Sequence, residues 1–516
     1  SGASERFIRF GRDRGKGMQD MATQAPAATP EGGQAGGQAG ENVSPRARQV
    51  TLFLLTATYF FSYMDRQILA ILLEDIKADL LLSDTQLGLL SGLAFAIFYA
   101  TLGIPVAALA DRINRVNIIS VALALWSGMT AMCGLAQNFT QLLLARIGVG
   151  VGEAGSSPPS HSIIADLYPA EKRALALSIY SLGVTLGAAA GQMFGGNLTY
   201  FFDWRTAFIA IGLPGVALAI IVKIFATEPM RKAEPGAVEA TETPSIREGF
   251  RSIFADLAAV WLVAGVTLTS MIGYALAGWT PAYLIRSFGL NTLQVGNIVA
   301  PLLAVAGVAS GLGSGWLANR LAERYGMQAQ PLMIAGLKLL ALPFLLVFYL
   351  VEDAWVAVGV YFIAVLFQSC YLGPTFAMIQ TLAPLRMRAV WAAVTLLVIN
   401  LIGLGIGPTL VGVISDLFEP RFGDQSLRYS LLVIAAQSTG ARAAMAFGVG
   451  FLLALGPFEH VVVSTLHMWF GLSLGAEISV QHLAKVSAVS LTGNLVGGVG
   501  LVTLSHAAQA LGEENG

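Results

Sequence analysis

The sequence predicts an all-α, polytopic membrane protein in which twelve spanning helices form two six-helix bundles around a central cavity. Three observations predict this fold. The 516-residue chain is 55% hydrophobic and only 12% charged, whereas soluble domains are roughly 25% charged. Its apolar residues gather in runs long enough to cross a bilayer. Two loop motifs occur once in each half of the chain, as expected of a duplicated membrane protein.

The apolar runs form two sets, which define the predicted domains. Residues 49–226 are expected to form the first six-helix bundle and residues 255–436 the second, whose last helix extends to 455 in an alternative interpretation. The polar stretch 227–254 between them predicts a cytoplasmic linker. The runs lie near 49–72, 86–110, 116–136, 140–163, 173–200, 205–226, 256–286, 294–319, 331–350, 355–382, 388–416 and 427–455.

The two ends of the chain differ from this core. Residues 1–48 include the Gly- and Gln-rich stretch 31–40, which has no apolar surface to bury, so we expect disorder there. Residues 437–516 form a hydrophobic tail of a different character, with four of the five histidines of the chain. We assign no function to this tail.

Repeated loops support the duplication. Asp111-Arg112-Ile113-Asn114-Arg115 follows the second apolar run, and a degraded copy, Asn319-Arg320-Leu321-Ala322-Glu323-Arg324, follows the eighth. A second pair has the pattern Pro-x-x-x-Arg-Ala, at 169–174 and at 384–389. The first of these leads into a helix with Gly183, Gly187 and Gly191. Their spacing of four puts all three on one face, which predicts close approach of another helix.

The positions of Lys and Arg predict the orientation in the membrane. Most of them fall in alternate loops, which the positive-inside rule places in the cytoplasm with the N-terminus of the chain. We therefore expect a multi-pass protein of the inner (plasma) membrane of a bacterium. The loops on this side carry Arg46, Arg48, Arg112, Arg115, Lys172, Arg173, Arg231, Lys232, Arg247, Arg251, Arg320, Arg324, Arg386 and Arg388.

These motifs resemble the major facilitator superfamily. The loop 111–115 resembles its signature between helices 2 and 3, and Arg146 followed by Gly148, Gly150 and Gly152 resembles its helix-4 pattern. The segments 63–67 (Tyr-Met-Asp-Arg-Gln) and 150–155 (Gly-Val-Gly-Glu-Ala-Gly) are similar to its Spinster-like branch. The resemblance covers about residues 49–436. It implies alternating-access transport, and that branch is associated with proton-coupled export of lysolipids, including sphingosine 1-phosphate.

The tail has a resemblance of its own. The segments 456–460 (Gly-Pro-Phe-Glu-His) and 493–498 (Gly-Asn-Leu-Val-Gly-Gly) are similar to the end of the formate/nitrite channel family. In that family a central histidine matters, and His460 would be the matching position. Because only the end of that fold is represented, the resemblance does not predict an independent pore.

Four ionisable side chains fall inside predicted spans: Asp65, Arg66, Arg146 and Glu153. Charges in lipid are costly and usually face a bundle interior or an aqueous cavity, where they serve transport. We expect Glu153 to be the main proton-coupling site and Asp65 a second one, because a carboxyl group takes up a proton when it is desolvated and releases it beside an arginine. Arg66 and Arg146 would be charge partners or substrate contacts. The alternative is a static ion-pair network.

Polar groups elsewhere give further candidates. Gln368 and Asn400 lie in apolar runs and are candidate substrate-binding residues, with simple packing as the alternative. Asp111, Arg112 and Arg115 lie at the cytoplasmic end of the second and third spans. The family resemblance implies that they gate this side, and the alternative is a loop that only sets topology.

The sequence predicts no enzyme, no cofactor and no metal site. It has no phosphate-binding loop, paired-cysteine motif or recognisable catalytic triad. A net charge of −1 gives no indication of a nucleic-acid partner. We therefore expect a proton-coupled secondary active transporter, whose partners are protons, membrane lipid and a small amphipathic or anionic substrate such as a lysolipid or sphingosine phosphate. Another organic anion or a drug is the alternative cargo. A non-transporting sensor or channel-like protein is the alternative class.

Overall fold

The computed structural model describes residues 43–110, 112–230, 245–326 and 329–435. Residues 1–42, which form most of the segment predicted to be disordered, lie outside the described residues, as do the tail 437–516 and Asp111. The first helix begins at Pro45, four residues before the predicted start. Ser44 caps it by accepting a hydrogen bond from the backbone of Ala47, and proline is favourable in the first turn of a helix.

The first half of the chain forms six transmembrane helices, two of which are divided. The fourth is divided at 154–156 because Pro158 and Pro159 have no N–H to bond the carbonyls of residues 154 and 155. The elements are α2 (Pro45–Leu80), α3 (Asp84–Ser91) continued by α4 (Leu93–Ala110), α5 (Arg115–Cys133), α6 (Phe139–Glu153) continued by α7 (Ser157–Leu167), α8 (Ala170–Phe201) and α9 (Trp204–Phe225).

The second half repeats this order. Its fourth helix is divided at 369–371, where Pro374 removes the hydrogen bond to the carbonyl of residue 370. The elements are α11 (Leu257–Phe288), α12 (Thr292–Gln294) with η1 (Val295–Val299) and α13 (Ala300–Tyr325), α14 (Ala329–Leu350), α15 (Ala354–Gln368) with α16 (Leu372–Leu382), η2 (Leu385–Met387), α17 (Arg388–Val398) with η3 (Ile399–Leu404) and α18 (Gly405–Phe422), and η4 (Gly423–Gln425). A sixth helix starts at Ser426 and is described to Ala435.

Within the described residues, nine helical stretches are long and apolar enough to cross a membrane. The helix α2 and the divided α6–α7 are not among them, although the sequence predicts spans there. Four charged residues of α2 and α6, namely Asp65, Arg66, Arg146 and Glu153, lower the hydropathy of these segments. The helices α2 and α6–α7 therefore differ from the nine apolar spans because they carry charge inside the membrane.

The linker holds a helix that the sequence analysis did not predict. The element α10 (Ile246–Phe254) begins with a capping box between Ser245 and Glu248. It lies against α17, where the indole nitrogen of Trp391 donates to the Ser252 hydroxyl at 3.2 Å, and it fixes the start of the second half.

Glycines bring α8 against α2, as their spacing predicts. A Cβ placed on Gly183, Gly187 or Gly191 would lie 2.8, 2.2 and 2.5 Å from the backbone oxygens of Thr56, Phe60 and Met64, respectively. No side chain fits at such distances, so the two backbones are in direct contact. This contact fixes the position of α2, which carries Asp65 and Arg66.

Replacing Gly187 with alanine is therefore expected to destabilise the protein by about 1–3 kcal/mol, because the added methyl group forces α2 and α8 apart. Thermal unfolding of the purified protein in detergent measures this. Gly359→Ala is the matched control, because a Cβ on Gly359 meets nothing within 4 Å and alanine is the better helix former. Equal melting temperatures for the two variants would contradict the close-contact explanation.

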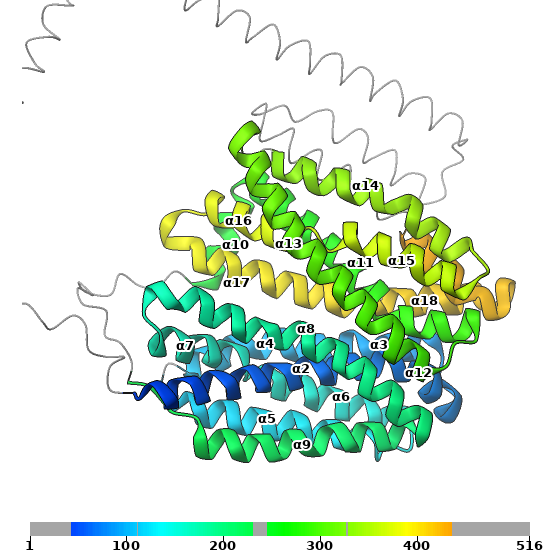
Figure 1. The fold of residues 1–516 in the computed structure, drawn as a ribbon, viewed down its shortest axis with the longest axis horizontal. Helices are drawn as coiled ribbons and strands as arrows, with labels where there is room; N and C mark the ends of the chain where they lie inside the picture. The colour runs from blue at the N-terminus through cyan, green and yellow to red at the C-terminus, as the bar shows by residue number, and fades with distance from the viewer. Residues whose placement is uncertain (1–42, 111, 231–244, 327–328, 436–516) are drawn as a thin grey trace, which may run out of the picture.

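The two halves meet mainly at one end of the molecule (Figure 1). We call this end the far side; it holds the turns 81–83, 202–203 and 289–291. The opposite end, the cationic side, holds the turns that begin at Arg112, Tyr168 and Ala383. On the far side α3 packs on α18, and α8 packs on α12 and η1. At the cationic end of α4, Ile104 and Leu109 are exposed. The helices are thus held together at the far side.

Candidate functional site

Glu153 lies deep in the first half because glycines let α6 approach its neighbours. A Cβ on Gly150 would lie 2.6 Å from the carbonyl oxygen of Phe95 in α4, and one on Gly152 would lie 2.7 Å from the backbone nitrogen of Trp126 in α5. Glu153 is the last residue of α6 and is 1% exposed. The helix-4 glycine pattern therefore places a carboxyl group where lipid and water are both excluded.

One oxygen of the Glu153 carboxylate receives two hydrogen bonds from α2. The Ser62 hydroxyl donates to Oε2 at 2.8 Å, and the Nε of Arg66 donates to the same atom at 2.6 Å. The other oxygen, Oε1, is buried and has no hydrogen-bond partner in the described part of the chain. The carboxylate is thus half satisfied, which leaves one oxygen to take a proton.

Aromatic rings surround the guanidinium group of Arg66. Its Cζ lies 4.9 Å from the centroid of the Tyr63 ring, 4.9 Å from that of Phe95 and 4.4 Å from that of Tyr99. Such cation–π contacts stabilise a desolvated cation without neutralising it. Arg66 can therefore remain charged in this position whether or not Glu153 is charged.

Asp65 of α2 contacts α5. Its side chain is completely buried, and the Thr130 hydroxyl donates to Oδ2 at 3.2 Å. Its Oδ1 has no hydrogen-bond partner among the described residues. The structure gives Asp65 no ion pair within that part of the chain, so the two predicted acids have different surroundings.

Arg146 is the second buried cation and does not pair with Glu153, although the two share a face of α6. It is 2% exposed, and its guanidinium lies 5.6 Å from the centroid of the Phe95 ring. Its Nε and Nη1 have no hydrogen-bond partner in the described residues. Both Arg66 and Arg146 thus contact the Phe95 ring, and the N–H groups of Arg146 without a partner in the described residues can bind an anion or water.

The candidate residues of the second half have contacts of their own. Gln368 ends α15, and its Oε1 accepts a hydrogen bond from the Nζ of Lys338 at 2.8 Å. Asn400 lies in the π-helical turn η3 and is half-buried. The structure therefore brings Asp65, Arg66, Arg146 and Glu153 together in the first half, while the roles of Gln368 and Asn400 stay predictions.

The predicted gating residues Arg112 and Arg115 have different surroundings. Arg112 is exposed in the turn after α4. Arg115 is 1% exposed and forms ion pairs with Asp166 at 2.5 Å and Glu228 at 2.6 Å. These contacts tie α5 to α7 and to the segment that follows α9, all within the first half.

Sequence reasoning missed a charged network on the far side. Arg286, near the end of α11, donates to Glu74 of α2 at 2.8 and 3.1 Å and to Asp84 of α3 at 2.7 and 2.8 Å. Asp416 of α18 accepts from the backbone nitrogens of Asp84 and Thr85 at 2.9 and 2.8 Å. These contacts join the two halves. In the sequence these residues look like ordinary loop charges, because nothing there indicates which ends of the helices meet.

Lys338 was also missed, although a signal was present. It is a lysine in the middle of the apolar run 331–350, and the structure leaves it 3% exposed. The rule that drew attention to Glu153, a charge inside a predicted span, applies to it equally. Among the described residues no group of three or more His, Cys, Asp or Glu side chains could hold a metal ion.

The fold and the site can now be compared with known proteins. The family model described as Major Facilitator Superfamily matches residues 55–408. The chain belongs to this superfamily. An MFS-type efflux pump of Mycolicibacterium smegmatis is 33% identical over 76% of this chain and 90% of its own length. Protein spinster homolog 1 of Xenopus tropicalis is 28% identical over 81% of this chain and 82% of its own length.

A solved structure agrees with both. A bacterial homolog of the human lysosomal transporter Spinster, in an inward-facing and unoccupied conformation, superposes with a TM-score of 0.72 and 29% identity, covering 79% of this chain and 98% of its own. The protein is therefore a Spinster-like, multi-pass membrane transporter and not an enzyme. The predicted twelve-helix fold is confirmed.

Proposed function

We propose that this protein is a proton-coupled secondary active transporter in which Glu153 is the main proton site. The observation that carries this proposal is the carboxylate of Glu153, buried at the end of α6, with Arg66 on one oxygen and no partner on the other in the described residues. Charged, Glu153 holds Arg66. Protonated, it no longer attracts the guanidinium, which its aromatic neighbours still accommodate.

Proton and cargo are then coupled through Arg66. An anionic cargo competes with Glu153 for the guanidinium, so protonation of Glu153 favours cargo binding and deprotonation favours release. Coupling requires that each ligand bind the two conformations with different affinity. Asp65 serves as a second acidic site, because it is completely buried beside α5, where the Thr130 hydroxyl donates to it.

The cargo we propose is an amphipathic anion, such as a lysolipid or a sphingosine phosphate. Arg146 has N–H groups without a partner in the described residues, and these suit an anionic head group. Gln368 and Asn400 would contact the cargo from the second half. The likeness to Spinster proteins supports a lipid-like molecule, which also makes membrane lipid the source of the cargo.

We infer that the cationic side faces the cytoplasm of a bacterium, with the N-terminus of the chain on that side of its inner membrane. Contact at the far side then corresponds to the inward-facing state. Residues 49–226 and 255–436 act as the two moving units, with 227–254 as the linker. Asp111, Arg112 and Arg115 close the cationic side in the opposite state.

An organic anion or a drug is the second candidate cargo, and the likeness to an efflux pump favours it. The mechanism would be the same, since it depends on Arg66 and Glu153 and not on a lipid tail. A sensor or channel-like protein is the remaining class. A protein of that class would move no solute uphill.

Transport by purified protein in liposomes tests the proposal. We expect a pH gradient to drive uphill accumulation of a lysolipid, with organic anions and sugars as the comparison cargoes. Accumulation of an organic anion alone would favour the second cargo. Downhill, pH-independent flux would contradict proton coupling and indicate a uniporter or a pore.

A further inference from the structure

The buried amine of Lys338 holds the break in the fourth helix of the second half. Lys338 lies midway along α14, and its Nζ donates to Gln368 Oε1 at 2.8 Å and to the backbone carbonyl of Gln368. The same amine lies 4.7 Å from the centroid of the Tyr371 ring. One charged group therefore contacts both the last residue of α15 and the residue that precedes α16.

A cation is favourable at the break between α15 and α16. The last carbonyls of a helix have no partner within the helix and form the negative end of its dipole. A cation at the end of α15 satisfies such a carbonyl and offsets part of the cost of its own burial. Pro374 prevents the hydrogen bond that would continue the helix across this point. Lys338 instead supplies a donor to the carbonyl of Gln368, two residues before the one that Pro374 leaves without a helical partner.

The first half has the same arrangement. There α6 ends at Glu153 before its own break, and Arg66, lying over the Tyr63 ring, donates to the Glu153 side chain. In each half a buried cation from another helix binds the last side chain before the break and lies over a tyrosine. The acceptor is a carboxylate in one half and an amide in the other. The cations belong to the first helix of one half and the third of the other, so duplication does not explain the likeness.

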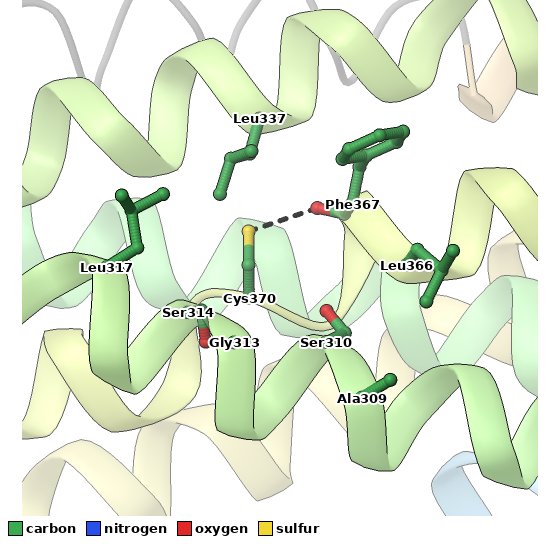
Figure 2. Close-up of a pocket in the computed structure, with 9 residues that line it drawn as sticks. All are labelled: Ala309, Ser310, Gly313, Ser314, Leu317, Leu337, Leu366, Phe367 and Cys370. Carbon is green, nitrogen blue, oxygen red and sulfur yellow. Dashed lines mark hydrogen bonds between the residues drawn. The ribbon is translucent and has the colours of Figure 1, made fainter.

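We propose that Lys338 is a positioning residue for transport, which holds α15 and α16 in their present geometry. The break between these helices, residues 369–371, is then a joint that moves during the transport cycle. Figure 2 shows the Cys370 sulfur among the residues that line a cavity of about 140 Å³ between α13, α14 and α15. This space borders the break and gives it room to shift. The Tyr371 hydroxyl lies within hydrogen-bond distance, 3.1 Å, of Ser270 in α11, and α11 contacts α2 of the other half.

This joint differs chemically from the one in the first half. The acceptor here is an amide, which does not titrate, whereas the acceptor in the first half is a carboxylate. The inference depends on the contacts of Lys338 and on transport by this family. It does not depend on which acid couples protons, so it stands or fails separately from the role of Glu153.

Cys370 reports the state of the joint directly. It is 1% exposed, and its thiol donates to the carbonyl of Phe367 at 3.0 Å (Figure 2). The only other cysteine of the chain is Cys133, and Cys133→Ser leaves Cys370 as the single thiol. The rate at which N-ethylmaleimide modifies Cys370 in the reconstituted protein then measures how often the joint opens.

We expect Lys338→Met to raise this rate at least about tenfold, because the hydrogen bonds from a charged donor are lost. Lys338→Arg should stay within a fewfold of the parent, since it keeps the cation. Lys172→Met removes an exposed lysine at the cationic side and should change nothing. A Lys338→Met protein that elutes as the parent does and is modified as slowly as the parent would overturn the proposal.

Substitutions at Gln368 give a second test that leaves Lys338 in place. Gln368→Leu removes the side-chain acceptor and should raise the modification rate. Gln368→Glu makes an ion pair and should lower the rate at neutral pH, with the protection disappearing as the pH falls and the carboxylate is protonated. Rates are taken relative to the parent at each pH, because thiol reactivity itself varies with pH. Equal rates for the Leu and Glu variants at neutral pH would also overturn the proposal.

Discussion

Replacing Glu153 with glutamine is expected to lower accumulation driven by a pH gradient by roughly 5- to 150-fold, the range of a typical coupling free energy between two sites. Glutamine keeps an oxygen that accepts from Ser62 and Arg66, so the fold should persist. It cannot release a proton, so cargo binding is no longer linked to pH. Liposomes with a defined inside and outside pH provide the measurement, and cargo exchange without a gradient should survive.

Two comparisons sharpen this test. Glu323→Gln removes an exposed acid at the end of α13 and should leave accumulation unchanged. Asp65→Asn should reduce it in part, as expected of a second site. If Asp65→Asn abolishes the pH dependence and Glu153→Gln preserves it, the main proton site is Asp65 and our assignment is wrong.

Replacing Arg286 with glutamine is expected to open the far side. Arg286 is the cation that bridges Glu74 of α2 and Asp84 of α3 from the second half. Its loss leaves two mostly buried carboxylates without that partner, a change that costs about 3 kcal/mol when one member of a buried pair is removed. The penalty falls only on the closed state, so the population should shift toward the open one by roughly a hundredfold.

Distances between spin labels measure this shift. Cysteines introduced at Leu81 and Asp424, both exposed on the far side and in different halves, should give longer distances in the Arg286→Gln protein. Arg205→Gln is the matched control, because Arg205 pairs with Asp79 on the same side but within the first half. An unchanged distance distribution for Arg286→Gln would show that other contacts, such as those of Asp416, hold the far side closed.

The proton-site hypothesis could be reached from sequence because burial in lipid makes charge rare. Glu153 and Asp65 stand out in apolar runs, and the glycines around Glu153 predict close neighbours. The arginine that pairs with Glu153 could not be predicted from hydropathy and glycine spacing. Arg66 and Arg146 were both predicted as charge partners, and nothing in the sequence chose between them. The structure pairs Glu153 with Arg66, because the direction of each side chain depends on how α2 lies against α6.

Nothing in the sequence indicates the contacts between the two halves. Asp84 and Arg286 are separated by 202 residues, and each is an ordinary charge near the end of a span. Arg115 was predicted as a gating residue from its loop. In this structure it pairs with Asp166 and Glu228 of its own half, and its gating role stays a prediction.

The amino-acid sequence by itself determined the twelve-helix fold class, the repeated loop motifs and the presence of charge inside the predicted spans. These follow from hydropathy and spacing, which are local and need no partner. Only the tertiary structure decided which cation meets which acceptor, that Lys338 holds the break at Gln368, and that the halves close at the far side. Such pairings depend on distances between helices far apart in the chain, and those distances are set by packing.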